Sequence, residues 1–414
     1  MSENNIITAI DIGTSKIVTL IGIKSSKGII KVIGTGISDC DGLIKGFVEN
    51  ISKTRIAIIN SLAEAEAQAN VKVSSAFIGI TGTHLEFLSR VDYFSSIGSN
   101  GVITSNEINE IPILVTNMFD ENNREIIHVF SGGYRIDGHD VINDPVGMHA
   151  KGIDATSHLV TANSEALMKI RECFSETGIS LNSCVFQPFV NGQVFLNTEE
   201  KFKGSAVIDI GKGTTDIAVF KNGTMVYTSV IPVGGFQFTN DICLTYQISY
   251  KDAEEIKLRY AHTIPSGIDM KEEIRTVVAE SNTEIKISRR ELAQLMRERA
   301  LELIRLIDLK LQQSGLTQDP NSRIVISGGG SHMDGLYDMA KQFLQCNHVN
   351  KAMVEKYHEY GIAAKNDIVA YSALGILLYA FSQHRNTYSN KTKNDKYTSI
   401  IFKKIKSAIN LKRD

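Results

Sequence analysis

Two short stretches of the chain place acids, glycines and hydroxyl groups at matching positions between apolar segments. In residues 207–220, VIDIGKGTTDIAVF, the apolar residues at both ends predict two strands, and Asp209 and Asp216 bracket the turn between them. A tight turn needs glycine and sometimes Asn or Asp, but it does not need an acid at the end of an apolar strand. Residues 7–22, ITAIDIGTSKIVTLIG, repeat the design around Asp11, 198 positions before Asp209. The repeat predicts two related halves.

The chemistry of both turns suits a phosphate chain. Glycines let backbone N–H groups approach an anion, and the Thr and Ser hydroxyls can donate to phosphate oxygens. Asp11 and Asp209 would face each other across a cleft and hold the water shell of Mg²⁺. One such turn alone is more often structural, but two in matching strand context favour phosphate binding. Besides the two acids, the predicted contacts are Gly13, Thr14, Ser15 and Lys16 in the first turn and Gly211, Lys212, Gly213, Thr214, Thr215 and Asp216 in the second.

Two glycine-rich segments extend the predicted site. Residues 323–336, RIVISGGGSHMDGL, run from a predicted strand through three glycines to a predicted helix start, which suits close approach of a nucleoside or phosphate. A plain loop is the alternative, although three consecutive glycines after a buried strand are costly without a reason. Gly234 and Gly235 follow the second hairpin and would lie at the floor of the same cleft. The candidate residues of the first segment are Gly328, Gly329, Gly330 and Ser331.

A charged pair lies in residues 251–262, KDAEEIKLRYAH. If this segment is helical, Glu254 and Lys257 are three residues apart and share one face. Alone, the pair would be a solvated ion pair. Together with the glycine-rich segments, it becomes a candidate nucleotide contact.

Composition and charge limit the function classes. The 414 residues are 43% hydrophobic and 22% charged, which is typical of a soluble protein long enough for two or more domains. The net charge of −2 gives no reason to expect nucleic-acid binding. Five cysteines without a CxxC pair argue against a metal or disulfide framework. No apolar run approaches the roughly 20 residues of a membrane span, and the polar N-terminus is unlike a signal peptide, so we expect a cytosolic chain.

The C-terminal residues change character. Residues 383–396 are polar and predict a flexible linker. Residues 397–414, YTSIIFKKIKSAINLKRD, predict an amphipathic helix that is too short to span a bilayer and whose basic residues suit anionic lipid. Docking of this helix onto the protein's own core is the alternative. The predicted membrane-binding residues are Ile401, Phe402, Lys403, Lys404, Ile405, Lys406, Ile409, Lys412 and Arg413.

The motifs IDIGTS, VIDIGKGTTDIAVF, VGGFQFTNDI, AEEIK and ISGGGSHMDGL resemble the ATPase superfamily of actin, Hsp70 and sugar kinases. Within it, the chain from residue 6 to residue 382 resembles the FtsA family of bacterial cell-division proteins. The resemblance implies an α/β, actin-like ATPase fold with two related halves around a nucleotide cleft, an FtsA-type extra subdomain and a C-terminal amphipathic helix. ATP and Mg²⁺ would be the cofactors. Glu254 and Lys257 would flank the adenosine, with the glycines from Gly328 on its other side.

The resemblance also implies the domain boundaries. The first half would comprise residues 1–83 and 161–202, and the extra subdomain residues 84–160. The second half would comprise residues 203–231 and 304–382. A smaller subdomain, residues 232–303, would lie on the nucleotide and FtsZ-peptide side. The linker and the membrane-targeting helix would follow.

Catalysis is where the sequence indicates least. Gln187, in CVFQPFVNG, stands where superfamily members place a Gln or Glu near the cleft, and it could orient the water that attacks ATP. A loop residue before Pro188 is the alternative. Asp209 is the other candidate catalytic residue. Lys212 departs from the glycine more often found there and does not indicate a P-loop, which requires GxxxxGK[ST]. We therefore expect ATP binding with at most weak ATPase activity.

The implied function is that of an actin-like cell-division protein that polymerises at the membrane. It would tether the FtsZ ring to the cytoplasmic side of the inner membrane at the division septum, as a peripheral protein, and recruit later division proteins. Its partners would be the FtsZ C-terminal peptide, further copies of itself, anionic lipid and other division proteins, without nucleic acid.

The predicted helix of residues 288–316, capped by Ser288 and Glu291, has a basic face that is most simply a solvated surface. By the resemblance, it would lie in the FtsZ-binding subdomain with Arg299 near the contact. Alternative functions are a PilM-like pilus-assembly homologue, or another ATPase of the superfamily acting as a chaperone or kinase. An Hsp70 would need a peptide-binding domain after the ATPase core, and a sugar kinase would need a set of polar sugar-binding residues.

Overall fold

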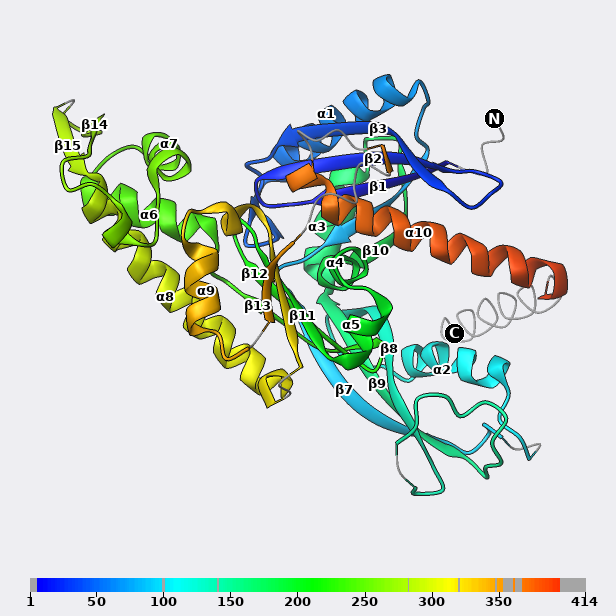
Figure 1. Ribbon diagram of the computed structural model, residues 1–414. Coiled ribbons are helices and arrows are strands. Elements are labelled where there is room, and N and C mark those ends of the chain that lie inside the picture. The colour runs from blue at the N-terminus through cyan, green and yellow to red at the C-terminus, as the bar shows by residue number, and fades with distance from the viewer. Residues whose placement is uncertain are drawn as a thin grey trace.

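The computed structural model describes residues 6–394 except 99–100, 140, 282, 319–320, 347, 353–359 and 362–366. Two five-stranded sheets form the cores of two halves (Figure 1). The first sheet has the order β10 (Ser180–Phe186), β6 (Ser75–Ile80), β1 (Ile6–Ile12), β2 (Lys16–Lys24), β3 (Ile30–Asp39). The second has the order β17 (His348–Lys351), β16 (Arg323–Ser327), β11 (Ser205–Ile210), β12 (Thr215–Lys221), β13 (Thr224–Ile231). The two sheets therefore share one topology.

The hairpins β1–β2 and β11–β12 also share one register. The innermost pairs are Ile12–Ile17 and Ile210–Thr215, a shift of 198 positions on both strands. In the first turn, the Gly13 N–H donates to the Lys16 carbonyl oxygen at 3.1 Å. In the second turn, the Gly211 N–H donates to the Thr214 carbonyl oxygen at 2.9 Å. The predicted division into two related halves is confirmed at the level of single backbone hydrogen bonds.

Helices cover both faces of the first sheet. They are α1 (Ile51–Ala69) and α3 (Ser164–Phe174) on one face, and α4 (Gln187–Phe195) and α10 (Asp367–Asn394) on the other. Alternate residues of β1 enter the two cores, with Ile10 and Ile12 on the α1 side and Ile7 and Ala9 on the α10 side. Burial on both faces explains why apolar residues of this strand do not strictly alternate with polar ones in the sequence.

Helix α10 differs from the predicted organisation in two ways. Residues 304–382 are predicted to belong to the second half, but α10 packs on the first sheet through Ala373, Leu374 and Leu377. An apolar segment does not reveal in its sequence which of two sheets it covers. The helix also continues to Asn394, through most of the predicted flexible linker. That segment is polar but contains neither Gly nor Pro, so no residue in it ends the helix.

The second half has its own core, in which four helices pack against the sheet. They are α6 (Gly235–Tyr246), α7 (Tyr250–Tyr260), α8 (Arg289–Gln313) and α9 (Leu336–Phe343). The hairpin of β14 (Glu273–Val277) and β15 (Glu284–Ser288) leads into α8. As predicted, Ser288 caps the start of α8, where its side chain accepts a hydrogen bond from the Glu291 N–H. Gly315, at φ +75°, follows the end of α8.

A three-stranded sheet forms the inserted subdomain, which lies at the bottom of Figure 1. Its order is β7 (Leu85–Phe94), β9 (Ile153–Asn163), β8 (Arg124–Ile136), and α2 (Ser105–Asn117) packs on it. β7 and β9 pair without interruption from Leu85–Ala162 to Phe94–Ile153. The remaining short elements are β4 (Leu43–Ile44), β5 (Phe47–Val48), α5 (Thr198–Lys203), η2 (Pro265–Gly267), η3 (Leu316–Gln318) and η4 (Gly329–His332).

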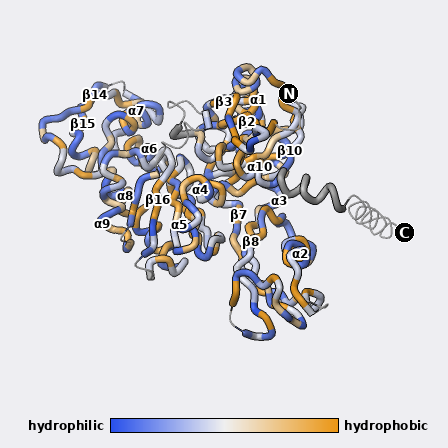
Figure 2. Tube along the Cα trace, turned by 45° about the vertical axis from the view of Figure 1, so that its right-hand side comes forward, coloured by the Kyte–Doolittle hydropathy of each residue, from blue (hydrophilic) through white to orange (hydrophobic). Residues whose placement is uncertain are grey.

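Hydropathy follows this organisation. Figure 2 shows hydrophobic stretches along interior elements such as β16 and α4, and hydrophilic ones around β14 and β15. Within the described ranges, no helix combines the length and apolar character that crossing a membrane requires. Residues 397–414, which carry the predicted membrane-binding helix, lie outside the described residues.

Candidate functional site

One helix holds the two predicted metal-site carboxylates, which come from different halves. Asp11 is the penultimate residue of β1, and Asp209 is the penultimate residue of β11. The Gln187 Nε2 donates to Asp11 Oδ1, and the Asn191 Nδ2 donates to Asp209 Oδ2 at 2.8 Å. Gln187 and Asn191 are four residues apart, so they lie on one face of α4. Helix α4 thus bridges the two carboxylates.

Helix α10 supports the second carboxylate from another direction. The Tyr371 hydroxyl donates to Asp209 Oδ1 at 2.7 Å, and the Ser372 hydroxyl donates to Asn191 Oδ1 at 3.0 Å. Asn191 and Ser372 are buried. Sequence reasoning missed these residues. The one available signal was the spacing of Asn191, one helical turn after Gln187.

Three carboxylates lie close enough to affect one another. Burial, followed by repulsion from Asp209 and Asp216, raises the pKa of Asp11 to about 8. Burial and repulsion from Asp209 raise the pKa of Asp216 to about 8. Asp209 rises less, to a pKa of about 6, because hydrogen bonds from Tyr371 and Asn191 oppose the effect of burial. Burial and mutual repulsion therefore disfavour the ionised forms of these carboxyl groups when no cation balances them.

The donor set fits a hard divalent cation such as Mg²⁺. Carboxylate oxygens are ligands that Mg²⁺ prefers, and a cation would favour the ionised form of Asp11 and Asp209. In the part of the chain that the structure describes, no group of three or more His, Cys, Asp or Glu side chains is arranged to hold a metal ion by itself. Water and phosphate oxygens would therefore complete the coordination, as Mg²⁺ usually requires.

The two predicted phosphate turns are in contact. A Cβ on Gly213 would lie 3.1 Å from Thr14 Oγ1 and 3.1 Å from the Cα of Lys45, so a side chain here would have to push these neighbours slightly apart. Thr214, in the second turn, is buried. The Thr215 hydroxyl instead donates to the Val233 carbonyl oxygen at 2.8 Å, which is a structural contact. The predicted turn residues that remain half-buried are Gly13, Thr14, Ser15, Lys16, Gly211 and Lys212.

The predicted charged pair, Glu254 and Lys257, is connected to the second turn by hydrogen bonds at Gly235, the first residue of α6. The Gly235 N–H donates to the Gly211 carbonyl oxygen at 2.9 Å. The Lys257 ammonium donates to the Gly235 carbonyl oxygen at 3.2 Å, to Thr239 Oγ1 at 2.8 Å and to Glu254 Oε2 at 2.7 Å. Burial lowers the pKa of Lys257. The pair is therefore part of a network beside Gly234 and Gly235, and sequence reasoning missed Thr239 in it.

The three consecutive glycines have different roles. Gly328, at φ +92°, leaves no room for a Cβ, which would lie 2.3 Å from Asp209 Oδ1. A Cβ on Gly330 would meet Ile210 Cγ2 at 2.6 Å, whereas one on Gly329 would meet nothing within 4 Å. Gly329 therefore faces open space beside Asp209.

The predicted helix start at Ser331 is wrong. Residues Gly329–His332 form the 3-10 helix η4, and the Ser331 hydroxyl donates to the Gly328 carbonyl oxygen at 2.7 Å. Helix α9 begins only at Leu336. Gly335, at φ +80°, takes a left-handed conformation that separates the two elements.

Arg299 is occupied within the second half. Its Nε and one terminal nitrogen donate to both carboxylate oxygens of Asp241, at 2.6 and 2.9 Å, and another terminal nitrogen donates to Glu302. This fork joins α8 to α6. The structure thus gives Arg299 an intramolecular role, and none of these bonds involves Asp11 or Asp209.

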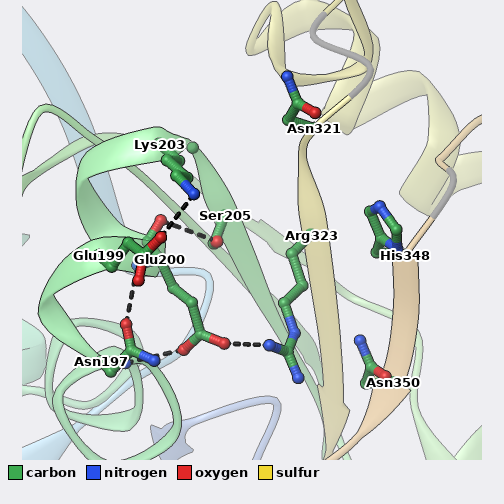
Figure 3. A pocket seen from close by; sticks show the side chains of 10 residues that line it. Asn197, Glu199, Glu200, Lys203, Ser205, Asn321, Arg323, His348 and Asn350 are labelled. Atoms are coloured by element: carbon green, nitrogen blue, oxygen red, sulfur yellow. Dashed lines mark hydrogen bonds and ion pairs between the residues drawn. The ribbon is translucent and has the colours of Figure 1, made fainter.

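A polar cavity of about 470 Å³ lies beside the starts of β11 and β16 in the second sheet (Figure 3). Ser205 and Arg323, which begin β11 and β16, line it, whereas the phosphate turn stands at the other end of these strands. Arg323 pairs with Glu200, and Lys203 pairs with Glu199 at 2.5 Å. This cavity is separate from Asp11, Asp209 and the two turns.

The chain matches known cell-division proteins. The profile described as "Cell division protein FtsA" matches residues 206–370, and "SHS2 domain inserted in FTSA" matches residues 82–161. The cell division protein FtsA of Neisseria meningitidis is 31% identical over 341 residues, which cover 82% of this chain and 82% of that relative. This chain belongs to the FtsA family.

Solved structures agree with this FtsA-family membership at the level of the fold. A chain of the PilM-PilN type IV pilus biogenesis complex has a TM-score of 0.62 at 14% identity, covering 90% of this chain and 98% of that chain. MreB 5 of Spiroplasma citri, bound to AMPPNP, has a TM-score of 0.56 at 14% identity, covering 94% and 99%. The predicted actin-like fold is confirmed. At this identity, the likeness to the pilus protein concerns the fold alone.

Proposed function

We propose that the chain is an ATP-dependent cell-division protein that forms filaments at the membrane, tethers the FtsZ ring and recruits later division proteins. The nucleotide-binding part of this proposal rests on the hydrogen bonds from α4 to the two carboxylates. Gln187 and Asn191 hold Asp11 and Asp209, which stand at equivalent positions of two matching hairpins. Neither hairpin needs a buried acid to fold. Membership in the FtsA family and the AMPPNP bound by MreB 5 support the proposal.

The phosphate chain of ATP would lie along the half-buried side of the two turns. Thr14 and Ser15 of the first turn, and Gly211 and Lys212 of the second, would supply hydroxyl and backbone N–H donors there. Mg²⁺, when bound, would neutralise charge on the phosphates. The carboxylates of Asp11 and Asp209 would accept hydrogen bonds from its coordinated waters.

We assign to Gln187 the role of orienting a water molecule. Its Nε2 donates to Asp11, which leaves Oε1 to accept a hydrogen bond from water on the phosphate side. A Gln that orients water recurs among nucleotide hydrolases. Orientation without a strong general base fits the expectation of weak ATPase activity.

The adenosine would lie between α7 and η4. Glu254 can accept hydrogen bonds from ribose hydroxyls, and Lys257 fixes its carboxylate at 2.7 Å. On the other side, Gly329 leaves open space for close approach of the nucleoside. Gly328, Gly330 and Ser331 would hold the backbone around Gly329 in position.

Membrane attachment belongs to residues 397–414. A short basic amphipathic helix binds an anionic surface weakly, so stable attachment requires many copies along one filament. This dependence links ATP-driven polymerisation to tethering at the inner face of the cytoplasmic membrane at the septum. The inserted subdomain would be a surface for later division proteins.

The decisive experiment is cosedimentation with anionic liposomes in ATP and Mg²⁺. The unchanged chain should sediment as filaments on lipid with little phosphate released. Phe402→Glu with Ile405→Glu should abolish lipid binding. The matched control, Ser407→Glu with Asn410→Glu, adds the same charge to the predicted polar face and should retain most of it. Equal lipid binding by both double variants would refute the anchor, and a chain that stays monomeric with ATP and lipid would refute the filament.

The proposed FtsZ contact near Arg299 depends on an ion pair that Arg299 already makes. Its guanidinium is held by both carboxylate oxygens of Asp241, so an acidic group on the peptide would have to join or displace that pair. Titration of the FtsZ C-terminal peptide against Arg299→Lys is the test, because Lys keeps the charge but not the fork. Unchanged peptide affinity would exclude Arg299 from the contact.

A further inference from the structure

The inserted subdomain reaches the start of α4 through one buried histidine. His128, in β8, accepts a hydrogen bond at Nε2 from the Phe186 N–H, at 3.1 Å. Phe186 ends β10 and is the N-cap residue of α4, immediately before Gln187. No side chain caps this helix start. The bond from His128 therefore fixes the residue next to the proposed water-orienting glutamine.

The local backbone aims the His128 ring at this target. The pairing of β8 with β9 shifts between Ile126 and His128, which is a bulge of the kind that re-aims a side chain. On the receiving side, β10 is an edge strand of the first sheet. Edge strands present backbone N–H groups that their own sheet does not satisfy. His128 satisfies one of them inside the protein.

The ring is enclosed by aromatic side chains from three elements. Phe130 of β8 stacks on it with ring centroids 5.4 Å apart. Phe189 of α4 and Tyr379 of α10 lie at 5.8 and 5.4 Å. Burial lowers the pKa of His128 to about 4, so the ring is neutral at pH 7 and its Nε2 keeps a lone pair for the Phe186 N–H. A phenyl ring would fill the same space but could not accept that hydrogen bond.

We propose that His128 is a positioning residue for Gln187, through which the inserted subdomain is coupled to the nucleotide site. The inference rests on the proposed function, because that function assigns Gln187 to the ATP site. Without the acceptor, the Phe186 N–H is left buried and unpaired, and the first turn of α4 shifts or opens to find another partner. Gln187 moves with that turn. Misplacement of a positioning group by about 1 Å can lower a rate by as much as 10²-fold.

The test compares three variants of the full chain. His128→Phe keeps an aromatic ring and removes the acceptor. His128→Gln keeps a polar acceptor on a side chain of similar reach. His158→Phe is the matched control, because His158 lies on the same sheet but stacks on Phe87 and hydrogen-bonds with Ser89. Amide hydrogen exchange at Phe186 is measured without nucleotide, and single-turnover phosphate release is measured over a range of ATP concentrations.

The expected pattern separates positioning from general instability. His128→Phe should speed exchange at Phe186 and lower the maximal rate of phosphate release at least about tenfold, with the half-saturating ATP concentration within about twofold. His128→Gln should restore both in part, and His158→Phe should change neither. If His128→Phe does not fold, the comparison of His128→Gln with His158→Phe still decides, because only the former should alter exchange at Phe186.

Two results would overturn the inference. One is exchange at Phe186 that does not respond to loss of the acceptor. The other is faster exchange with an unchanged maximal rate. Failure of the unchanged chain to bind ATP would instead refute the proposed function, and the exchange measurement would still decide whether His128 orders the start of α4.

Discussion

The two hairpins are equal in backbone and unequal in charge. Both close with the same turn hydrogen bond, and both end their first strand one residue after an acid. Asp209, however, pairs across its hairpin with Asp216, whereas Asp11 pairs with Val18, which is buried in the core beneath α10. The second hairpin therefore carries one more carboxylate. The comparison teaches that backbone hydrogen bonds and glycines preserve the scaffold, while single side chains set the chemistry of each half.

The largest expected effect comes from removing either paired acid. Asp11→Ala and Asp209→Ala should each weaken Mg²⁺-dependent ATP binding by at least about 100-fold, or roughly 3 kcal/mol, because each removes a carboxylate that the cation requires. Fluorescent-nucleotide titration with Mg²⁺ measures this loss, and the same titration in EDTA is the control. An Asp11→Ala chain with unchanged affinity would show that only the second hairpin binds the metal.

The extra carboxylate should cost stability in the nucleotide-free chain. The pKa of Asp216 in the fold, about 8, lies above its ordinary value of 3.8. The stability that this group contributes is therefore complete below pH 4 and is lost as the pH rises toward 8. Asp216→Asn should be no more stable than the unchanged chain near pH 4, and more stable by on the order of 2 kcal/mol at pH 8. Urea unfolding at several pH values measures this difference.

Asp120, which is exposed, supplies the control for that series. Asp120→Asn should shift stability by less than about 0.5 kcal/mol at every pH. A stability gain from Asp216→Asn that does not grow with pH would contradict the electrostatic difference between the hairpins.

The two acids also differ in how many side chains hold them. Asp209 accepts hydrogen bonds from Tyr371 and Asn191, and the Gln187 amide donates to Asp11. Tyr371→Phe removes one donor and leaves the Asn191 amide in place, so Mg²⁺-dependent ATP affinity should fall only about fivefold, or roughly 1 kcal/mol. Calorimetric titration measures it. A loss as large as that of Asp209→Ala would mean that Tyr371 alone orients the carboxylate.

The smallest expected effect concerns the lysine of the second turn. Lys212 stands where the first turn has Thr14, and it is half-buried. Lys212→Thr makes the two turns more alike, and ATP affinity should change by less than about threefold, the scale of an exposed charge. Nucleotide titration at low and high salt measures this. A larger loss that salt removes would place the ammonium on the phosphates.

Local sequence signals indicated the acids and glycines of the two turns, but not the side chains that hydrogen-bond to them from other segments. Asp11, Gly213 and Gly328 were predictable because an acid after an apolar strand and a glycine in a turn are departures from the surrounding pattern. Asn191, Tyr371 and Thr239 were not, because each belongs to an ordinary helical segment and gains its role from a partner elsewhere in the chain. Their contacts exist only after the sheets have formed.

The same limit explains the errors over larger segments. Helix α10 is apolar enough to cover either sheet, and its sequence does not state which one. The polar residues after Phe381 indicated solvent exposure, which a helix satisfies as well as a coil when no Gly or Pro interrupts it. His128 gave no signal, because a lone histidine among apolar residues has the same pattern as a core position.

The uninterrupted pairing of β7 with β9 makes the inserted subdomain a long two-stranded arm. Ten paired residues at about 3.3 Å each make an arm of roughly 33 Å. Its root, Leu85 and Ala162, is embedded in the core that also contains Ile10 and Ile12 on either side of Asp11. A ribbon whose two strands are paired along their whole length bends less easily than a single strand. A sideways force at the far end would therefore act as a torque at the root, next to the strand that carries the first carboxylate.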